Sequence, residues 1–340
     1  MSFFNFRTQG IAIDLGTANF LMIFEDRVVV DEPAVIAFNR TTGATIAVGR
    51  KAEQMEGKEH ENIRIIRPLK NGVIADFHAA EHMMRGMLKL ANNGKGMFSP
   101  SYRMLICVPS GITEVEKRAI RDSAMIAGAK DVYLVHEPVA AAIGIGLDVQ
   151  DATGHMIVDI GGGTTEIAVI ALSGIVCDQS IRVAGDNFNA DIIHHVRRQH
   201  NIHIGASMAE KIKLEVGAAL PELQDPPLDF AIKGRDLMSG LPKQVMVSYQ
   251  EVAYYLDKSI TKIEEAILKT LEITPPELSS DIHHSGIFLT GGGALLRGLD
   301  KRIASRTKLP VHVADEPLLS VVKGTAIALK KIDEFRFLMR

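Results

Sequence analysis

The sequence predicts an α/β protein built from two similar lobes. Strand-like and helix-like patterns alternate along the chain, which is typical of the α/β class. The segment 11–24, IAIDLGTANFLMIF, is echoed by the segment 156–172, MIVDIGGGTTEIAVIAL. Each has an apolar strand, an aspartate, a turn of glycine and threonine, and a second apolar strand. Asp14 and Asp159 lie roughly 145 residues apart, and a repeat of that length indicates two similar domains rather than a solenoid.

Composition excludes several classes of protein. The chain has 340 residues, a formal net charge of −3 and 46% hydrophobic residues, so it is neither disordered nor a basic nucleic-acid binder. Its two cysteines, Cys107 and Cys177, lie in apolar runs without a CxxC pair, which excludes a disulfide framework and a cysteine zinc site. We interpret both as small buried hydrophobes. No apolar run approaches the roughly 18 residues that span a bilayer and no signal peptide is evident, so we expect a cytosolic protein with peripheral membrane contact.

The first half of the chain predicts mostly strands. We expect strands over 11–16, 20–25, 27–38, 44–49, 104–110 and 132–135, because these runs are apolar and β-branched. Polar residues 17–19 would form a hairpin turn between the first two. Helices are expected over 78–93, which ends at the turn NNGKG, and over 114–129, where Gly128 is a plausible stop.

The second half predicts longer helices around a second set of strands. We expect strands over 156–163, 166–172, 175–184 and 286–293, a loop over 221–227, and helices over 189–200, 207–220, 250–271 and 319–332. A further helix would contain Leu295, Leu296 and Leu299. The helix over 250–271 has the clearest pattern, because its apolar residues recur every three or four positions from Val252 to Leu271.

The two repeated turns carry the strongest chemical signal. Glycine lets several backbone N–H groups point at one phosphate, and the hydroxyls of Thr17, Thr164 and Thr165 add donors. The aspartates beside these turns would repel a phosphate unless a cation lies between them, and Mg²⁺ uses one or two carboxylates together with phosphate oxygens. One such turn could be a plain hairpin. Two copies at corresponding places predict a nucleotide held in a cleft between the lobes.

A third glycine cluster, Gly291, Gly292 and Gly293, closes the strand GIFLT. A strand–glycine–helix junction can hold the sugar and base of a nucleotide, although this signal is weak alone. Neither a Walker A pattern nor a GxGxxG after a strand is present, which disfavours the P-loop and Rossmann classes.

Histidines give a weaker signal. His78, Glu81 and His82 match the zinc-protease pattern HxxEH, but no third ligand is evident, so an amphipathic helix is the better interpretation. We interpret the remaining clusters as solvated faces: His194, His195, His200, His203, His283 and His284.

Five motifs together resemble the actin-like ATPase superfamily. They are DLGTAN (14–19), PSGIT (109–113), HEPVAAAIG (136–144), DIGGGTTE (159–166) and TGGGALLRGL (290–299), and this set includes sequences that look like its phosphate-1, connect-1, phosphate-2 and adenosine elements. Within the superfamily, IRPLKNGVIADF (66–77) and PSGITEVEKRAI (109–120) resemble the MreB family of bacterial actins. The resemblance covers nearly the whole chain.

The resemblance implies roles for single residues. Asp14 and Asp159 would hold Mg²⁺ through water, and Glu137 would orient the water that attacks ATP, although an acid at a helix N-terminus is also common for stability alone. Glu210 and Lys213 look like contacts to ribose and base, and Glu215 is a further candidate; an exposed charged helix face is equally compatible with the sequence. The residues implied to surround the nucleotide are Gly16, Thr17, Ala18, Asn19, Gly161, Gly162, Gly163, Thr164, Thr165 and Gly291–Gly293.

Two departures from the family pattern stand out. Phe20 replaces a small polar residue after DLGTAN, and GDNFN (185–189) replaces a more acidic GDExD. The second departure replaces two acids of that pattern with Asn187 and Asn189, whereas Gly185 and Asp186 are kept.

The resemblance also implies a fold. It is the two-lobed actin-like fold, with two duplicated RNase H-like core subdomains, each carrying a smaller inserted subdomain. The implied boundaries are 1–32, 75–144 and 318–340 for subdomain IA, 33–74 for IB, 145–182 and 244–317 for IIA, and 183–243 for IIB.

The implied function is that of a filament-forming bacterial actin. It would bind ATP or ADP with Mg²⁺, hydrolyse ATP slowly, polymerise as paired protofilaments at the inner membrane, and organise cell-wall elongation with membrane proteins of that machinery. Membrane contact would come from apolar residues in two segments, Phe3, Phe4 and Phe6 at the N-terminus and Met97 and Phe98 in a glycine-flanked loop. The alternatives are a plasmid-segregating actin, a small-molecule kinase and a chaperone ATPase of the same fold. The chaperone would need an extra domain for which 340 residues leave no room.

Overall fold

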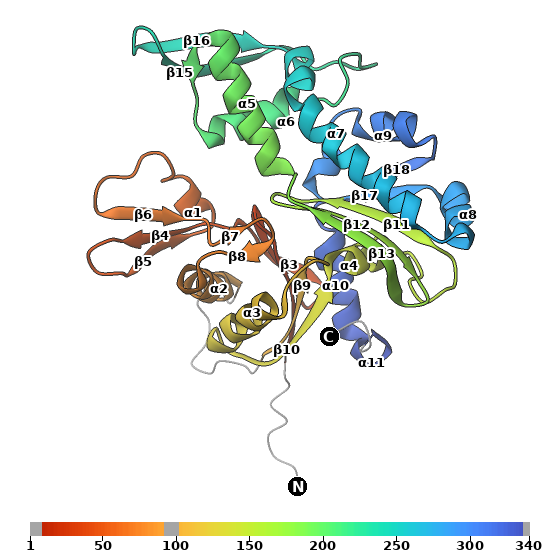
Figure 1. Ribbon diagram of the computed structural model, residues 1–340. Coiled ribbons are helices and arrows are strands. Elements are labelled where there is room, and N and C mark those ends of the chain that lie inside the picture. Colours follow the sequence, from red (N-terminus) through yellow and green to blue (C-terminus); the bar gives the residue numbers. More distant parts are fainter. Residues whose placement is uncertain (1–8, 92–101, 336–340) are drawn as a thin grey trace. The chain divides into compact units, whose positions relative to one another are not determined.

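The computed structural model describes residues 9–91 and 102–335 (Figure 1). The chain divides into two compact units. The first comprises Met1–Ala152, Ile170–Ile175 and Leu318–Arg340, and the second comprises Thr153–Val169 and Val176–Pro317.

The first unit is built on a five-stranded sheet. Its strands are β1 (Gln9–Leu15), β2 (Asn19–Phe24), β3 (Arg27–Pro33), β9 (Tyr102–Val108) and β10 (Ala129–His136), in the order β10-β9-β1-β2-β3. β1 and β2 form the expected hairpin, whereas β9 runs parallel to both β1 and β10. The carboxyl ends of β1, β9 and β10 therefore meet at one edge of the sheet, where α/β proteins place their ligands.

Helices cover both faces of this sheet. On one face, Ile11 and Ile13 of β1 pack in one apolar cluster with residues of α2 (Phe77–Ala91) and α3 (Glu114–Ile126). On the other face, Ala12 packs against Val322 of α10 (Ser320–Lys330), as strand alternation requires. α10 also crosses α4 (Glu137–Gly144) closely. Gly144 and Gly324 face the partner helix backbone there, so neither position has room for a Cβ.

The remaining elements of the first unit are short. They are β4 (Ile36–Asn39), β5 (Thr45–Val48) and β6 (Ile63–Ile66), which form a three-stranded sheet, α1 (Arg50–Glu53), the hairpin β7 (Leu69–Lys70) and β8 (Val73–Ile74), and α11 (Ile332–Phe335). The strand predicted over 27–38 is wrong in one respect, because the chain bends after Pro33 and changes sheets. β3 pairs with β2, whereas β4 pairs with β5 and β6.

The second unit repeats the topology of the first. Its main sheet contains β11 (His155–Ile160), β12 (Thr165–Ala171), β13 (Gly174–Ile181), β17 (Ile287–Thr290) and β18 (Val311–Val313), in the order β13-β12-β11-β17-β18. This order matches β3-β2-β1-β9-β10, and β17 is parallel to both β11 and β18. The echo between 11–24 and 156–172 therefore reflects two copies of one sheet.

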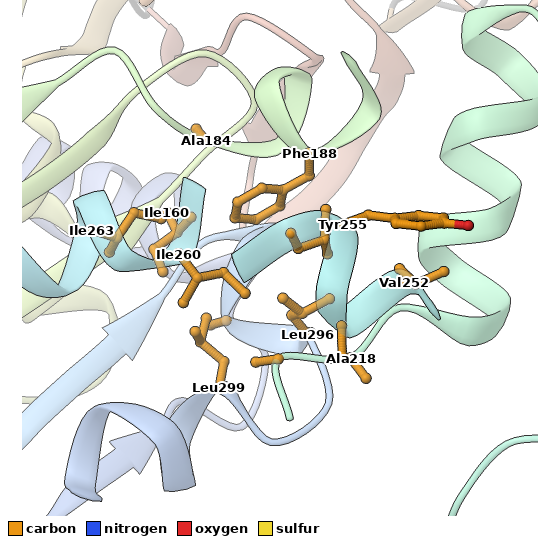
Figure 2. Close-up of a cluster of buried hydrophobic side chains, with 14 of the residues drawn as sticks. Ile160, Ala184, Phe188, Ala218, Val252, Tyr255, Ile260, Ile263, Leu296 and Leu299 are labelled. Atoms are coloured by element: carbon orange, nitrogen blue, oxygen red, sulfur yellow. The ribbon is translucent and has the colours of Figure 1, made fainter. Parts of the chain in front are cut away.

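Helices of the second unit surround one large core. They are α5 (Gly185–His200), α6 (Ala206–Val216), α7 (Tyr249–Ile273), α8 (Pro276–Ser285), the 3₁₀ helix η1 (Gly292–Leu295) and α9 (Leu299–Thr307). A separate three-stranded sheet contains β14 (Ile202–His203), β15 (Phe230–Asp236) and β16 (Pro242–Val247). Phe188 of α5 and Ile260 of α7 meet in this core with Ile160, the last residue of β11 (Figure 2). The prediction of one helix containing Leu295, Leu296 and Leu299 is wrong, because left-handed Gly298 separates η1, which ends at Leu295, from α9, which begins at Leu299.

Among the described residues, no helix combines the length and the apolar character that crossing a bilayer requires.

Candidate functional site

The first predicted turn joins β1 to β2. Gly16 is required for packing, because a Cβ there would lie 2.8 Å from the carbonyl oxygen of Asn19. Ala18 is fixed through its carbonyl, which accepts a hydrogen bond of 2.8 Å from the N–H of Ala34. Asn19 begins β2 and is exposed. The turn is thus rigid at its base and leaves Asn19 accessible.

Thr17 is tied to the β7–β8 hairpin, which lies within the family-like segment 66–77. The N–H of Gly72 donates a hydrogen bond of 2.8 Å to the buried Thr17 Oγ1. Asn71 and Gly72, both with positive φ, form the tight turn between β7 and β8, and the Asn–Gly pair is a known signal for such turns. Because Thr17 accepts from Gly72, its own hydroxyl hydrogen can point to another acceptor such as a phosphate oxygen.

Three functional groups gather at the carboxyl edge of the first sheet. Asp14 and Cys107 are register partners on β1 and β9, and the Cys107 thiol donates a hydrogen bond of 3.2 Å to Asp14 Oδ1. Glu137 follows β10 directly, as the first residue of α4, and is half-buried. The sequence predicted Asp14 and Glu137 here, but Cys107 only as a buried hydrophobe.

Burial makes this edge electrostatically unusual. Desolvation raises the pKa of Asp14 to about 6, although the hydrogen bond from Cys107 acts in the opposite direction. Burial, and then the charges of Asp14 and Glu137, raise the pKa of the Cys107 thiol well above its usual range, so the thiol stays protonated. Asp14 is half-buried, and a desolvated carboxylate of this kind is stabilised by a nearby cation, so Asp14 fits the role of a partner to Mg²⁺.

The second turn, between β11 and β12, is fastened to the start of α5. Gly161 N–H donates to Thr164 O at 2.9 Å, and the N–H groups of Gly185 and Asp186 donate to the carbonyls of Gly161 and Gly162 at 3.1 and 2.8 Å. The Thr165 hydroxyl donates to Val183 O at 2.7 Å, so it already has an acceptor. Thr164 is also buried. The turn is therefore held by protein contacts on one side.

The third glycine cluster packs against Asp159 within the same unit. Asp159 is buried and in register with Thr290 on the neighbouring strand β17. Gly291 has a positive φ, and a Cβ there would collide with the Asp159 carboxylate. A Cβ on Gly293 would collide with the Ile160 side chain. These glycines are therefore needed for packing, whatever they bind.

Glu210 and Lys213 lie beside the second turn. Lys213 Nζ donates to Glu210 Oε2 at 2.8 Å and to Gly185 O at 3.5 Å. Asn189 Nδ2 donates to the same Glu210 oxygen at 2.7 Å. Lys213 is largely buried, so the pair is not a purely solvated helix face, whereas Glu215 is exposed.

The histidines make other contacts. His78 and His82 of α2 contact each other with tilted rings whose centroids are 4.4 Å apart, and His82 Nδ1 shares a hydrogen bond of 3.1 Å with Thr45 Oγ1. His195 stacks on Tyr255 at 4.7 Å. In the described part of the chain, no three His, Cys, Asp or Glu side chains converge so as to hold a metal ion.

The sequence profile of the MreB/Mbl protein family matches residues 8–336. The chain belongs to the MreB/Mbl family. It is 46% identical over 331 residues to the cell shape-determining protein MreB of Escherichia coli K12, covering 96% of this chain and 94% of that protein. It is 45% identical over 327 residues to the cell shape-determining protein Mbl of Bacillus subtilis 168, covering 96% and 97%.

Solved structures place the fold among the bacterial actins. MreB 5 of Spiroplasma citri, solved with AMPPNP, superposes with a TM-score of 0.90 at 39% identity and covers 96% of this chain and 98% of its own. The same protein has been solved with ADP. A subunit of the MamK double helical filament gives a TM-score of 0.79 at 20% identity, covering 96% and 99%. The fold is therefore the actin-like fold expected from the sequence.

Proposed function

We propose that this MreB/Mbl family member is a filament-forming bacterial actin that determines cell shape. It binds ATP or ADP, hydrolyses ATP slowly, assembles beneath the inner membrane and organises cell-wall elongation with membrane proteins of that machinery. The observation that carries this proposal is the recurrence of one Asp–Gly–Thr turn in two sheets of identical topology. The Spiroplasma citri relative solved with AMPPNP and ADP supports nucleotide as the ligand.

Each residue group has a proposed role. Gly16–Asn19 and Gly161–Thr165 would contact the phosphate oxygens, the second turn through N–H groups other than that of Gly161, which already donates to Thr164 O. The Asp14 and Asp159 carboxylates would hold Mg²⁺ through its waters. The cation supplies neutralisation of charge on the phosphates. Glu210, Lys213 and Gly291–Gly293, which adjoin the second turn, contact the ribose and base.

Glu137 has a separate role, which is to accept a hydrogen bond from the attacking water. Phosphoryl transfer needs mainly positioning and charge neutralisation, so one well-placed carboxylate can control its rate. Glu137 stands at the same sheet edge as Asp14, which supports this assignment.

Sedimentation of the full chain with and without ATP tests the proposal. We expect pelleting with Mg²⁺ and ATP and filaments in electron micrographs of the pellet. Phosphorylation of a small-molecule acceptor without any polymer would instead support a kinase. Asp159→Ala, which removes one Mg²⁺-linked carboxylate, should severely weaken Mg²⁺-dependent nucleotide binding, and normal hydrolysis by this variant would refute the assignment of Asp159.

The membrane segments and subdomain boundaries remain proposals from the sequence. Phe3, Phe4, Phe6, Met97 and Phe98 lie outside the described residues. The four subdomains, with IA at 1–32, 75–144 and 318–340, IB at 33–74, IIA at 145–182 and 244–317, and IIB at 183–243, are proposed from the family resemblance.

A further inference from the structure

Cys107 lies on β9, the strand beside β1, and its side chain contacts the carboxylate of Asp14. The two residues are register partners on parallel strands, so their side chains lie on the same face of the sheet. Cys107 is only 2% exposed, and its thiol donates to Asp14 Oδ1. Its neighbours Ile106 and Val108 point to the opposite face, into the apolar cluster beneath α2 and α3.

We propose that Cys107 is a positioning residue, whose thiol fixes Asp14 Oδ1 and leaves Oδ2 to accept from the water shell of the bound cation. The proposal rests on the function proposed above. A carboxylate at a strand end can rotate about its side-chain torsions, and one fixed oxygen removes much of that freedom. Orientation of a ligand by a neighbouring hydrogen bond is a general feature of metal sites.

The chemistry of a thiol suits this role. A lysine or arginine at position 107 would form an ion pair with Asp14 and would repel the cation that Asp14 has to attract. A thiol is neutral and a weak donor, so it can orient the carboxylate while leaving most of its negative charge for the metal-bound waters.

The second sheet has a comparable residue at the equivalent position. Thr290 on β17 is in register with Asp159, as Cys107 on β9 is with Asp14. The Thr290 hydroxyl is buried and has no hydrogen-bond partner among the described residues. Unlike Cys107, Thr290 gives no hydrogen bond to its aspartate, so among the described residues only the first sheet has an aspartate oriented in this way by its strand neighbour.

Three substitutions at Cys107 in the full chain separate donation from packing. Cys107→Ser keeps a donor, Cys107→Val keeps an apolar side chain without a donor, and Cys107→Ala removes both donor and volume. Cys177→Ala is the matched control, because Cys177 contacts Thr270 and Thr274 in the second unit and not the aspartates. For each variant, the affinity for a fluorescent ATP analogue is measured across a Mg²⁺ titration and again in EDTA.

We expect Cys107→Val and Cys107→Ala to need about three- to tenfold more Mg²⁺ for half-maximal nucleotide binding, as for loss of one ordinary hydrogen bond, because a thiol is a weak donor. Affinity in EDTA should change less than twofold. Cys107→Ser and Cys177→Ala should resemble the wild type. If Cys107→Val needs no more Mg²⁺ than the wild type, or if Cys107→Ser is as impaired as Cys107→Val, the proposal is overturned. If the wild type binds the ATP analogue equally well with and without Mg²⁺, the metal assignment in the proposed function is refuted instead.

Discussion

In the protein without Mg²⁺ and nucleotide, burial makes the ionised form of Asp14 energetically unfavourable. Its pKa is raised to about 6 by burial, above the value near 4 expected in the unfolded chain. The native state therefore binds more protons than the unfolded state between about pH 4 and pH 6. Without Mg²⁺ and nucleotide, the contribution of Asp14 to stability is most favourable below pH 4 and falls as the pH rises through 6.

Substitution of Asp14 tests this sign. Asp14→Asn removes the charge and keeps the shape, so it should raise the unfolding midpoint at pH 7 by a few degrees, corresponding to about 1–3 kcal/mol. The gain should shrink as the pH falls toward 4. Thermal unfolding in EDTA at several pH values measures it, and a lower midpoint for Asp14→Asn at pH 7 would contradict the electrostatic argument.

Asp236 provides a control of opposite sign. The backbone N–H of Ser239, then Lys243 and the N–H of Met238, lower the pKa of Asp236. A lowered pKa stabilises the native state above the unfolded pKa, and this stabilisation is lost as the pH falls. Asp236→Asn should therefore reduce the unfolding midpoint at pH 7, whereas Asp14→Asn raises it.

Glu137 should separate catalysis from binding. Glu137→Ala should retain ATP and assemble, yet hydrolyse ATP about 100-fold more slowly, because only water positioning is lost. Phosphate release in the polymer and ATP affinity are measured on the same preparation. Glu114→Ala is a matched control, since Glu114 is also the first residue of a helix but is exposed and pairs with Lys117. Collapse of ATP affinity with unchanged turnover would make Glu137 a binding or structural residue.

Residues of the site could be predicted where a sequence motif repeats. Contacts between strands that lie far apart in the sequence could not. Asp14 and Asp159 could be paired because the same turn follows each of them. The thiol of Cys107 could not be assigned to Asp14, because the register of β1 with β9 joins residues 93 positions apart. The hydrogen bond between Gly72 and Thr17 could not be predicted for the same reason, because the two residues are 55 positions apart, although Asn71–Gly72 is a recognisable turn signal.

At the scale of elements, the contact between α5 and α6 explains one of the two replaced acids in GDNFN, the one at position 189. Asn187 Oδ1 accepts a hydrogen bond of 3.0 Å from Ala184 N–H at the helix start, and Asn189 donates to Glu210 of α6. Position 187 therefore needs a hydrogen-bond acceptor, and position 189 needs a hydrogen-bond donor. An acid would therefore suit position 187 and oppose Glu210 at position 189.

A pair of substitutions on this helix checks the distinction. Asn189→Asp should destabilise the protein by about 1 kcal/mol, because two carboxylates then face each other and a hydrogen bond is lost. Asn187→Asp should be neutral or slightly stabilising, since it still accepts from Ala184 and adds negative charge in the first helical turn. Chemical denaturation without nucleotide measures both. Equal effects of the two variants would exclude a specific Asn189–Glu210 contact.

Helices and strands whose buried apolar residues recur at regular spacing could be predicted from the sequence. Those with few buried residues could not. α7 matches its prediction within two residues at each end, because it has twelve buried residues and a capping box of Ser248 and Glu251. β15, β16 and α8 were missed. Only Ile232 of β15, Val247 of β16 and Ile282 of α8 are buried, so their sequences carry almost no pattern.

At the scale of the whole molecule, the two units show how far a short repeat extends. The echo covers about one hairpin in each half, yet the complete strand order β10-β9-β1-β2-β3 recurs as β18-β17-β11-β12-β13. Outside the hairpins, packing constrains each strand to be apolar without fixing its residues. The duplication is therefore visible in topology where it is no longer visible in sequence.

Membrane attachment, as proposed from the sequence, would be a property of the assembled polymer rather than of the single chain. Phe3, Phe4 and Phe6 precede the first strand, and Met97 and Phe98 lie in the segment NNGKGMFSPS. Each group alone offers little apolar area to a bilayer, but a filament presents it once per subunit, so weak contacts add up. Arg7 and Lys95 would add attraction to anionic lipid, about 1 kcal/mol each.

Removal of both groups should uncouple lipid binding from assembly. We expect a chain without residues 2–7 that also carries Met97→Ser and Phe98→Ser to polymerise with ATP but no longer to pellet with liposomes containing anionic lipid. Single removal of either group should leave partial binding, which shows whether the two contribute together. Leu228→Ser and Met238→Ser form the matched control, because both side chains are about nine-tenths exposed and apolar but lie in the second unit. Undiminished lipid pelleting of the combined variant would show that the anchor lies elsewhere in the chain or belongs to a partner protein.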